Sequence, residues 1–75
     1  MEKLKKFRKE KGLSQESMAQ KMGITLSMYE KVEQGRAGAS AKFMKRLKKV
    51  FPEVNIDYIF FETNSKDIAV GTTEN

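Results

Sequence analysis

The 75-residue chain contains no cysteine, no histidine and no tryptophan, and it has a single proline. Without cysteine, the chain can form neither a disulfide nor a thiolate metal site, which is compatible with a reducing compartment. Without histidine, it has no imidazole to ligate zinc, to activate a serine or to act as a general base. The carboxylates are scattered and form no catalytic pair. We therefore expect a protein that is not an enzyme and needs no metal or small-molecule cofactor.

Long apolar runs are also absent. The longest is the four-residue run Tyr58–Phe61, and a helix that crosses a bilayer needs about 20 apolar residues. The N-terminal stretch MEKLKKFRKEK is charged where a signal peptide has an apolar core. We expect one domain at most, located in the cytoplasm and without a membrane segment.

Positive charge dominates only part of the chain, although the net charge is +5. Residues 1–51 hold all but one of the 15 Lys and Arg residues and half of the 10 acidic residues. Residues 52–75 are acidic on balance. A cationic body with an acidic end suits a polyanionic partner on one side of the molecule. An ordinary solvated basic surface is the alternative.

The stretch QESMAQKMGITLSMYEKVEQG, residues 15–35, predicts two short helices joined by a tight corner. Ser14 can cap the first helix, and Thr25 can cap the second, over residues 25–34. Gly23 supplies the left-handed residue that ends a helix at low cost. A glycine between two such helices is the signature of a helix-turn-helix. A helical hairpin that only packs is the alternative.

Three further helices are expected from the spacing of apolar residues, over about residues 2–11, 41–51 and 56–61. Ser40 can cap the helix over 41–51. This helix carries an apolar stripe that should face the core: Phe43, Leu47, Val50 and Phe51. The expected fold class is all-α, a compact five-helix bundle that contains the helix-turn-helix. It should occupy residues 1–61, and residues 62–75 should form a flexible polar C-terminal tail.

One charged residue points toward the predicted core. Arg8 shares a helix face with Leu4, where an unpaired guanidinium would be costly. Glu33 lies beside the inward-facing Tyr29 and is the natural partner for an ion pair. In the alternative, Arg8 reaches solvent or a phosphate.

An unusual share of the side chains on the outer face of the helix over residues 25–34 is short, polar and uncharged. With Tyr29 directed inward, helical geometry directs Ser27, Lys31 and Gln34 away from the core. Such a face can enter a groove between two rows of phosphates and offer donors and acceptors to base edges. Taken alone, it would also fit an ordinary solvated helix.

The combined pattern is more specific than any one of these features, and its residues are Gln15, Ala19, Gly23, Ile24, Tyr29, Val32, Glu33 and Gly35. From about residue 4 to residue 60, the chain resembles the phage repressor/Cro type of helix-turn-helix, the XRE family of transcriptional regulators. The resemblance implies a lambda-repressor-like DNA-binding domain with its second motif helix in the major groove. It also implies the Arg8–Glu33 pair.

The resemblance implies base-reading positions at Leu26, Ser27 and Lys31, with Gln15 bridging a phosphate to these readers. Gln34 joins them because it points outward. Leu26 departs from the family pattern, since many members have a polar or basic reader there. Few side chains are therefore available to read the bases directly by hydrogen bonds, and DNA shape should supply part of any specificity.

Phosphate contacts are expected from Thr25, Arg36, Lys42 and Lys45. Lys42 lies in the first turn of its helix, where the helix dipole disfavours a cation unless a phosphate is bound nearby.

Tyr58 and Phe61 fall on the outer side of the last short helix. Because exposed aromatic residues mark interfaces, we expect a homodimer joined there. The predicted function is sequence-specific binding of duplex DNA at an approximately palindromic operator, by a small phage-like or mobile-element-like repressor. The alternative is a protein-interaction module, such as an antitoxin whose C-terminal tail binds a partner protein.

Overall fold

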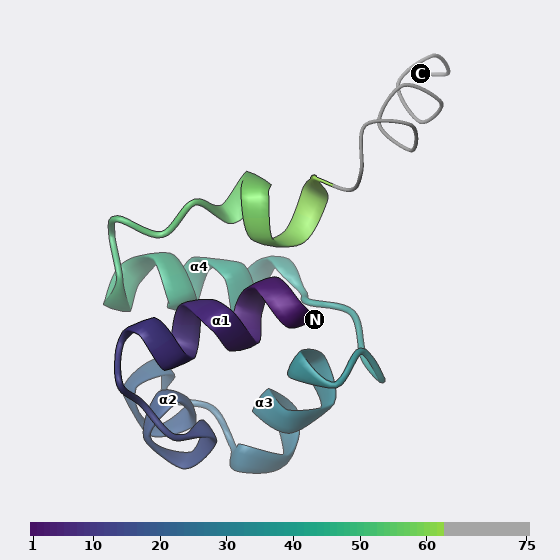
Figure 1. The fold of residues 1–75 in the computed structure, drawn as a ribbon. Helices are drawn as coiled ribbons and strands as arrows, with labels where there is room; N and C mark the ends of the chain where they lie inside the picture. Colours follow the sequence, from purple (N-terminus) through teal and green to yellow (C-terminus); the bar gives the residue numbers. More distant parts are fainter. Residues whose placement is uncertain (63–75) are drawn as a thin grey trace.

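The computed structural model describes residues 1–62, so the expected tail lies outside the described residues except for Glu62. In chain order, the elements are α1 (Glu2–Glu10), α2 (Gln15–Met22), α3 (Leu26–Glu33), α4 (Ala41–Val50) and η1 (Asp57–Phe61) (Figure 1). No strand occurs within residues 1–62. The predicted all-α architecture of five helices is therefore confirmed.

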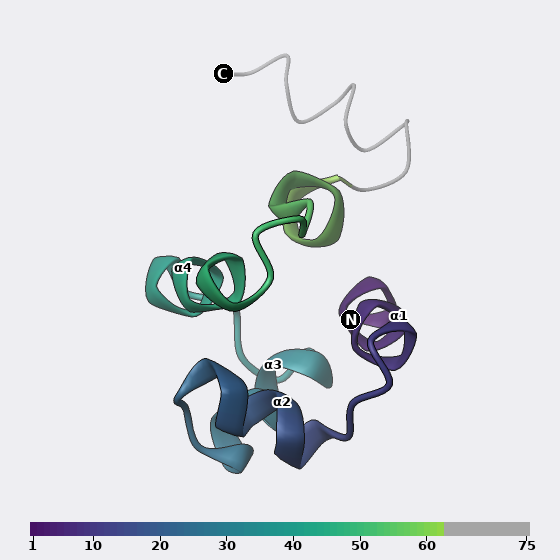
Figure 2. The ribbon, with the colours of Figure 1, turned by 90° about the vertical axis from the view of Figure 1, so that its left-hand side faces the viewer.

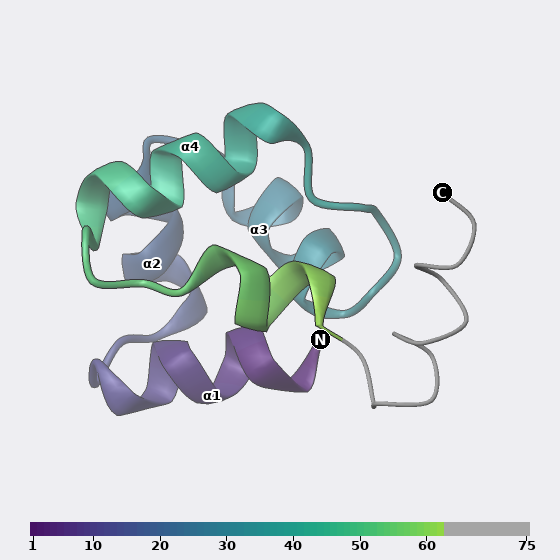
Figure 3. The ribbon, with the colours of Figure 1, turned by 90° about the horizontal axis from the view of Figure 1, so that it is seen from above.

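The helices enclose the core from four sides. α1 and α4 lie on either side of it, with η1 across one end and the α2–α3 pair across the other (Figure 1 and Figure 2). Seen from above, η1 lies between α1 and α4 (Figure 3). The two helices of the predicted motif are thus at the opposite end of the molecule from η1.

Each helix contributes at least one buried apolar side chain to this core. The buried residues are Leu4, Met18, Ala19, Met22, Tyr29, Val32, Phe43, Leu47, Val54 and Ile59. Val50 and Phe51, which were expected in the core stripe, are only half-buried. They lie at the carboxyl end of the α4 region and pack against the edge of the core. Phe51 meets Phe7 edge-on there, with 5.4 Å between ring centroids.

Hydroxyl groups cap the starts of three helices, at the positions predicted. Each accepts a hydrogen bond from a backbone amide three residues ahead, which would otherwise lack an intrahelical partner. The oxygen–nitrogen distances are 3.0 to 3.1 Å, and the pairs are Ser14 with Ser17, Thr25 with Met28, and Ser40 with Phe43.

The corner between α2 and α3 contains the predicted left-handed glycine. Gly23 has a φ angle of 71°, and the amide of Ile24 donates to the carbonyl of Ala19 at 3.0 Å. Arg46 of α4 holds this corner, because its Nη1 donates to the carbonyl of Met22 at 3.1 Å. That carbonyl is one of those that a helix end leaves without an intrahelical partner. A Cβ atom placed on Gly23 would lie only 2.9 Å from the same Nη1.

A buried polar cluster joins α1, α2 and α3. Arg8 donates from Nε to Oε2 of Glu33 at 2.9 Å and from Nη2 to Oε1 at 3.2 Å. Tyr29 Oη donates to Oε2 at 2.6 Å, and Gln15 Nε2 donates to Oε1 at 2.9 Å. Arg8 and Glu33 are only 8% and 6% exposed. Across residues 1–62, no buried side-chain nitrogen or oxygen is left without a hydrogen-bond partner.

This cluster determines the ionisation of its members. Burial alone would raise the pKa of Glu33, but hydrogen bonds from Arg8, Tyr29 and Gln15 outweigh it and hold that pKa below its ordinary value of 4.5. Burial, followed by the hydrogen bond to Glu33, raises the pKa of Tyr29, so its phenol remains a donor. The hydrogen bond to Glu33 raises the pKa of Arg8. At neutral pH the cluster is an ion pair supported by two neutral donors.

The last helix differs in type from the expectation. A short regular helix was predicted over residues 56–61, whereas η1 is a π-helix that begins at Asp57. Its wider turn is closed by the amide of Glu62, which donates to the carbonyl of Asp57 at 2.8 Å. Lys3 of α1 stabilises its carboxyl end, since Nζ donates to the carbonyls of Tyr58 at 3.1 Å and Glu62 at 2.7 Å.

Replacement of Gly23 with alanine should destabilise the fold by more than the 1–2 kcal/mol, roughly, that a left-handed backbone costs, because the new Cβ would press on Arg46. Gly12→Ala is the matched control, since Gly12 has a φ angle of 72° and no atom within 4 Å of the added Cβ. Urea unfolding should show the larger loss for Gly23→Ala. Equal losses would mean that Arg46 moves aside without cost.

Acid should weaken the fold through Glu33. Its pKa is lower in the folded state than in the unfolded chain, so the unfolded chain binds a proton more readily. The stabilisation is complete above the unfolded-state pKa, roughly 4.3, and is lost as the pH falls through the lower folded-state pKa. Free energies of unfolding from urea titrations across this range should show that fall.

A Glu33→Gln variant identifies the group responsible. It should lose about 3–5 kcal/mol at neutral pH, because it leaves the Arg8 guanidinium buried without its counter-charge. Its stability should also change less with acid. Glu53→Gln is the control, since Glu53 makes an exposed ion pair with Lys11 and its loss leaves a solvated ammonium. Equal losses in the two variants would contradict a stabilising role for the buried pair.

Candidate nucleic-acid interface

The outer face of α3 is open to solvent. Leu26 is 40% exposed, and Ser27 and Lys31 are also exposed, whereas Tyr29 and Val32 are buried on the opposite face of the helix. The caps and the corner described above fix the start of α3, so these three side chains project from a helix held against the core. Short polar groups on such a face can reach base edges in a groove.

The two glutamines expected at this face each make one contact within the chain. Gln15 is half-buried, and its Nε2 is held by Glu33. An amide nitrogen carries two hydrogens, so Gln15 can still donate one hydrogen bond outward. Gln34 is exposed just after α3, and its Oε1 accepts a hydrogen bond from Arg36 Nε at 2.9 Å. The buried cluster therefore orients Gln15 directly.

Two of the expected phosphate-contacting residues line one groove. Thr25 and Lys42 border an opening of about 400 Å³ between the α2–α3 corner and the start of α4. Arg46 lines it as well, and no acidic residue among residues 1–62 does. This groove is therefore electrostatically suited to an anion.

Arg36 lies in the loop that follows α3 and is exposed. The amides of Arg36 and Ala37 both donate to the carbonyl of Lys31, at 2.8 and 3.1 Å. These bonds fold the loop back onto the end of α3, so Arg36 remains close to that helix.

Lys45 does not line the groove of Thr25 and Lys42. It lines a separate groove between α4 and η1, together with Glu53 and Asp57. The two carboxylates would repel a phosphate. This side of α4 is therefore less suited to DNA than the side that carries Lys42.

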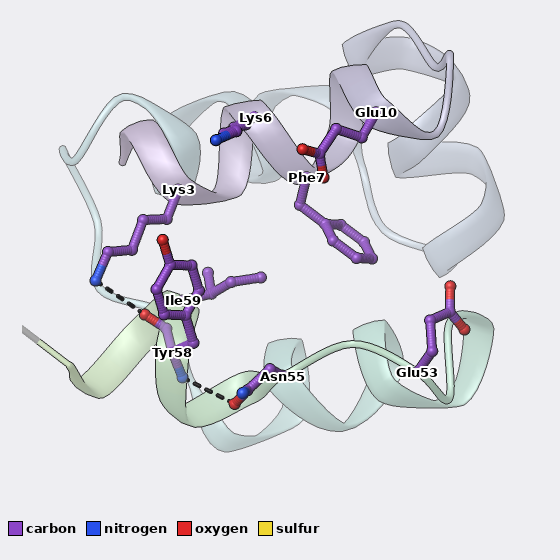
Figure 4. A pocket seen from close by; sticks show the side chains of 8 residues that line it. All are labelled: Lys3, Lys6, Phe7, Glu10, Glu53, Asn55, Tyr58 and Ile59. Carbon is purple, nitrogen blue, oxygen red and sulfur yellow. Dashed lines mark hydrogen bonds between the residues drawn. The ribbon is translucent and has the colours of Figure 1, made fainter.

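Tyr58 and Phe61 are exposed at the end of the molecule opposite α3, at 47% and 60%. The ammonium of Lys3 lies 4.4 Å from the centroid of the Tyr58 ring. Beside this ring is an opening of about 280 Å³, with Phe7 and Ile59 among its lining residues (Figure 4). Tyr58 thus borders a partly apolar hollow at the end of the molecule away from α3.

Two other kinds of feature are lacking in residues 1–62. No three His, Cys, Asp or Glu residues there are grouped so that they could hold a metal ion. In the same residues, no helix has both the length and the apolar character needed to cross a membrane.

Comparison with known protein families identifies the family to which this chain belongs. A model of the helix-turn-helix family HTH_3 matches residues 4–59, which is more than half of the chain. Searches of curated proteins and of solved structures gave no match. The matched range begins in α1 and ends in η1, so it includes all the buried core residues and both helices of the motif, α2 and α3. The chain therefore belongs to the HTH_3 family of helix-turn-helix domains, of the XRE/Cro/C1 type, and is a DNA-binding protein.

Proposed function

We propose that this protein is a sequence-specific repressor of transcription that binds duplex DNA as a homodimer. The observation that carries the proposal is the outer face of α3, where Leu26, Ser27 and Lys31 are exposed. The buried cluster and Arg46 anchor this helix. In this arrangement α3 lies in the major groove. Repression follows from occupancy, because a protein bound at a promoter blocks polymerase. We also propose that the protein is cytoplasmic and is a repressor of the phage or mobile-element type.

We assign base recognition to three residues in the first two turns of α3: Leu26, Ser27 and Lys31. Lys31 can donate to guanine acceptors, and Ser27 can donate or accept. Leu26 can offer only apolar contact, for example to a thymine methyl group. Gln15 and Gln34 lie at the borders of this face. With so few hydrogen-bonding readers, sequence-dependent DNA shape contributes to specificity.

Phosphate contacts hold the duplex against this face. Thr25 and Lys42 border the groove that lacks acidic residues, and Arg36 lies on the loop that folds back onto α3. We propose these three as the principal contacts. Lys45 has a lesser role, because Glu53 and Asp57 share its groove.

Dimerisation through Tyr58 and Phe61 would explain why two large aromatic side chains are exposed at the end away from DNA. A single domain reads only a few base pairs, which is poor discrimination against a genome of competing sites. Two domains related by a two-fold axis read half-sites about 34 Å apart on an approximately palindromic operator.

Selection of duplexes from a random pool tests the proposed function directly. The expected result is enrichment of one motif with approximate two-fold symmetry. Flat enrichment would contradict sequence-specific regulation, and an enriched motif without symmetry would contradict the dimer.

Base readers and phosphate contacts should respond differently to substitution. Lys31→Ala and Ser27→Ala should change the preferred bases, at about 1–3 kcal/mol for the position that each reads. Lys42→Ala removes the same charge as Lys31→Ala but should weaken all duplexes alike. Binding measurements on a panel of operator variants separate the two patterns. An unchanged base preference in folded Lys31→Ala and Ser27→Ala would show that α3 is not the reader.

The dimer should depend on the two exposed aromatic residues. A Tyr58→Lys, Phe61→Lys double variant should be a folded monomer in sedimentation equilibrium and should lose most of its operator affinity. The control replaces two exposed apolar residues at the other end, Leu26→Lys and Met28→Lys, and should remain dimeric. A wild type that stays monomeric at high micromolar concentration, both free and on DNA, would refute the dimer.

A further inference from the structure

A polar groove runs between α1 and the carboxyl end of α3. It has a volume of about 480 Å³, and Gln15 and Gln34 are among its lining residues. Both glutamines also border the proposed reading face, so the groove continues that face toward α1. Lys5 and Lys9, on α1, line the same groove. None of the base-reading or phosphate-binding roles proposed above involves either lysine.

The groove carries excess positive charge. Lys5 and Lys9 are both exposed, and residues four apart on a helix lie on the same face. Glu33 also lines the groove, but its carboxylate is already bound by Arg8, Tyr29 and Gln15. The other acidic lining residue is Glu2, and no ion pair joins it to either lysine in the part of the chain that the structure describes.

In the two grooves that border η1, acidic side chains balance the lysines. One contains Glu53 and Asp57 beside its lysines, and the other contains Glu10 and Glu53. Both are lined by residues of η1, which lies at the end of the molecule opposite α2 and α3 (Figure 1). A polyanion bound at the reading face would therefore extend along the α1 groove rather than toward η1.

We propose that the α1 groove binds the sugar–phosphate backbone of the duplex beyond the base pairs that α3 reads, with Lys5 and Lys9 as the contacting cations. The inference rests on the proposed function, because only a duplex at α3 brings its backbone past Gln15 and Gln34. Backbone contacts position a protein without reading sequence. Lys5 and Lys9 therefore add affinity and lengthen the site that the protein covers, while the preferred bases stay the same.

The test compares two double variants that lose the same charge from exposed helix positions. The first variant, Lys5→Gln, Lys9→Gln, removes both lysines from the α1 groove. The control variant, Lys48→Gln, Lys49→Gln, removes two lysines from the last turn of α4. Both are titrated against the duplex that wild type selects, over a range of salt concentrations. The α1 variant should show a log–log salt slope shallower by about 0.9 for each lysine, while the control keeps the wild-type slope.

Duplex length gives a second readout. Removal of the base pairs that flank the selected motif should weaken wild type and the control, whereas the α1 variant should hardly respond. Urea unfolding checks that all three proteins are folded. Equal slopes in all three, or equal flattening in both variants, would overturn the inference while leaving the proposed function intact. A wild type that enriches no motif would instead contradict the proposed function.

Discussion

The orientation of the first three helices depends on one buried carboxylate. Glu33 of α3 accepts hydrogen bonds from Arg8 of α1, Gln15 of α2 and Tyr29 of its own helix. Movement of α1 or α2 relative to α3 would break a bond to a charged group away from water, where the loss is expensive. The same carboxylate orients Gln15 at the edge of the proposed reading face. Core stability and the position of the proposed DNA contacts therefore rest on one interaction.

Charge is distributed in keeping with this arrangement. Within the described part of the chain, the groove beside the α2–α3 corner is lined by Lys42 and Arg46 and by no acidic residue, while the grooves around η1 contain Glu53, Asp57 and Glu10. Long-range attraction toward a polyanion would orient the molecule so that α3 faces the polyanion. Arg46 also stabilises the corner through the carbonyl of Met22. One basic residue thus serves both the packing of α4 and the electrostatic character of the interface.

Local patterns predicted most of the fold, because caps, glycines and apolar spacing act over a few residues. Ser14, Thr25 and Ser40 cap their helices as expected, and Gly23 is left-handed. The Arg8–Glu33 pair joins residues far apart in the chain and was expected from the sequence, but other contacts between distant residues were missed. Nothing local to Arg46 or Lys3 indicates that one would bind the end of α2 and the other the end of η1. The π-helical turn and the separate groove of Lys45 likewise depend on how η1 packs, which spacing does not encode.

The exposure of Leu26, Ser27 and Lys31 bears on how such a protein diversifies. None of the three is buried in the core, and substitutions at exposed positions usually change stability by less than about 0.5 kcal/mol. A lineage can therefore exchange these side chains without dismantling the scaffold. Their mutational freedom contrasts with the constraint on Arg8 and Glu33, where either change strands a buried charge. Duplicated copies of this domain would be expected to diverge in the sites they recognise while keeping the same interior.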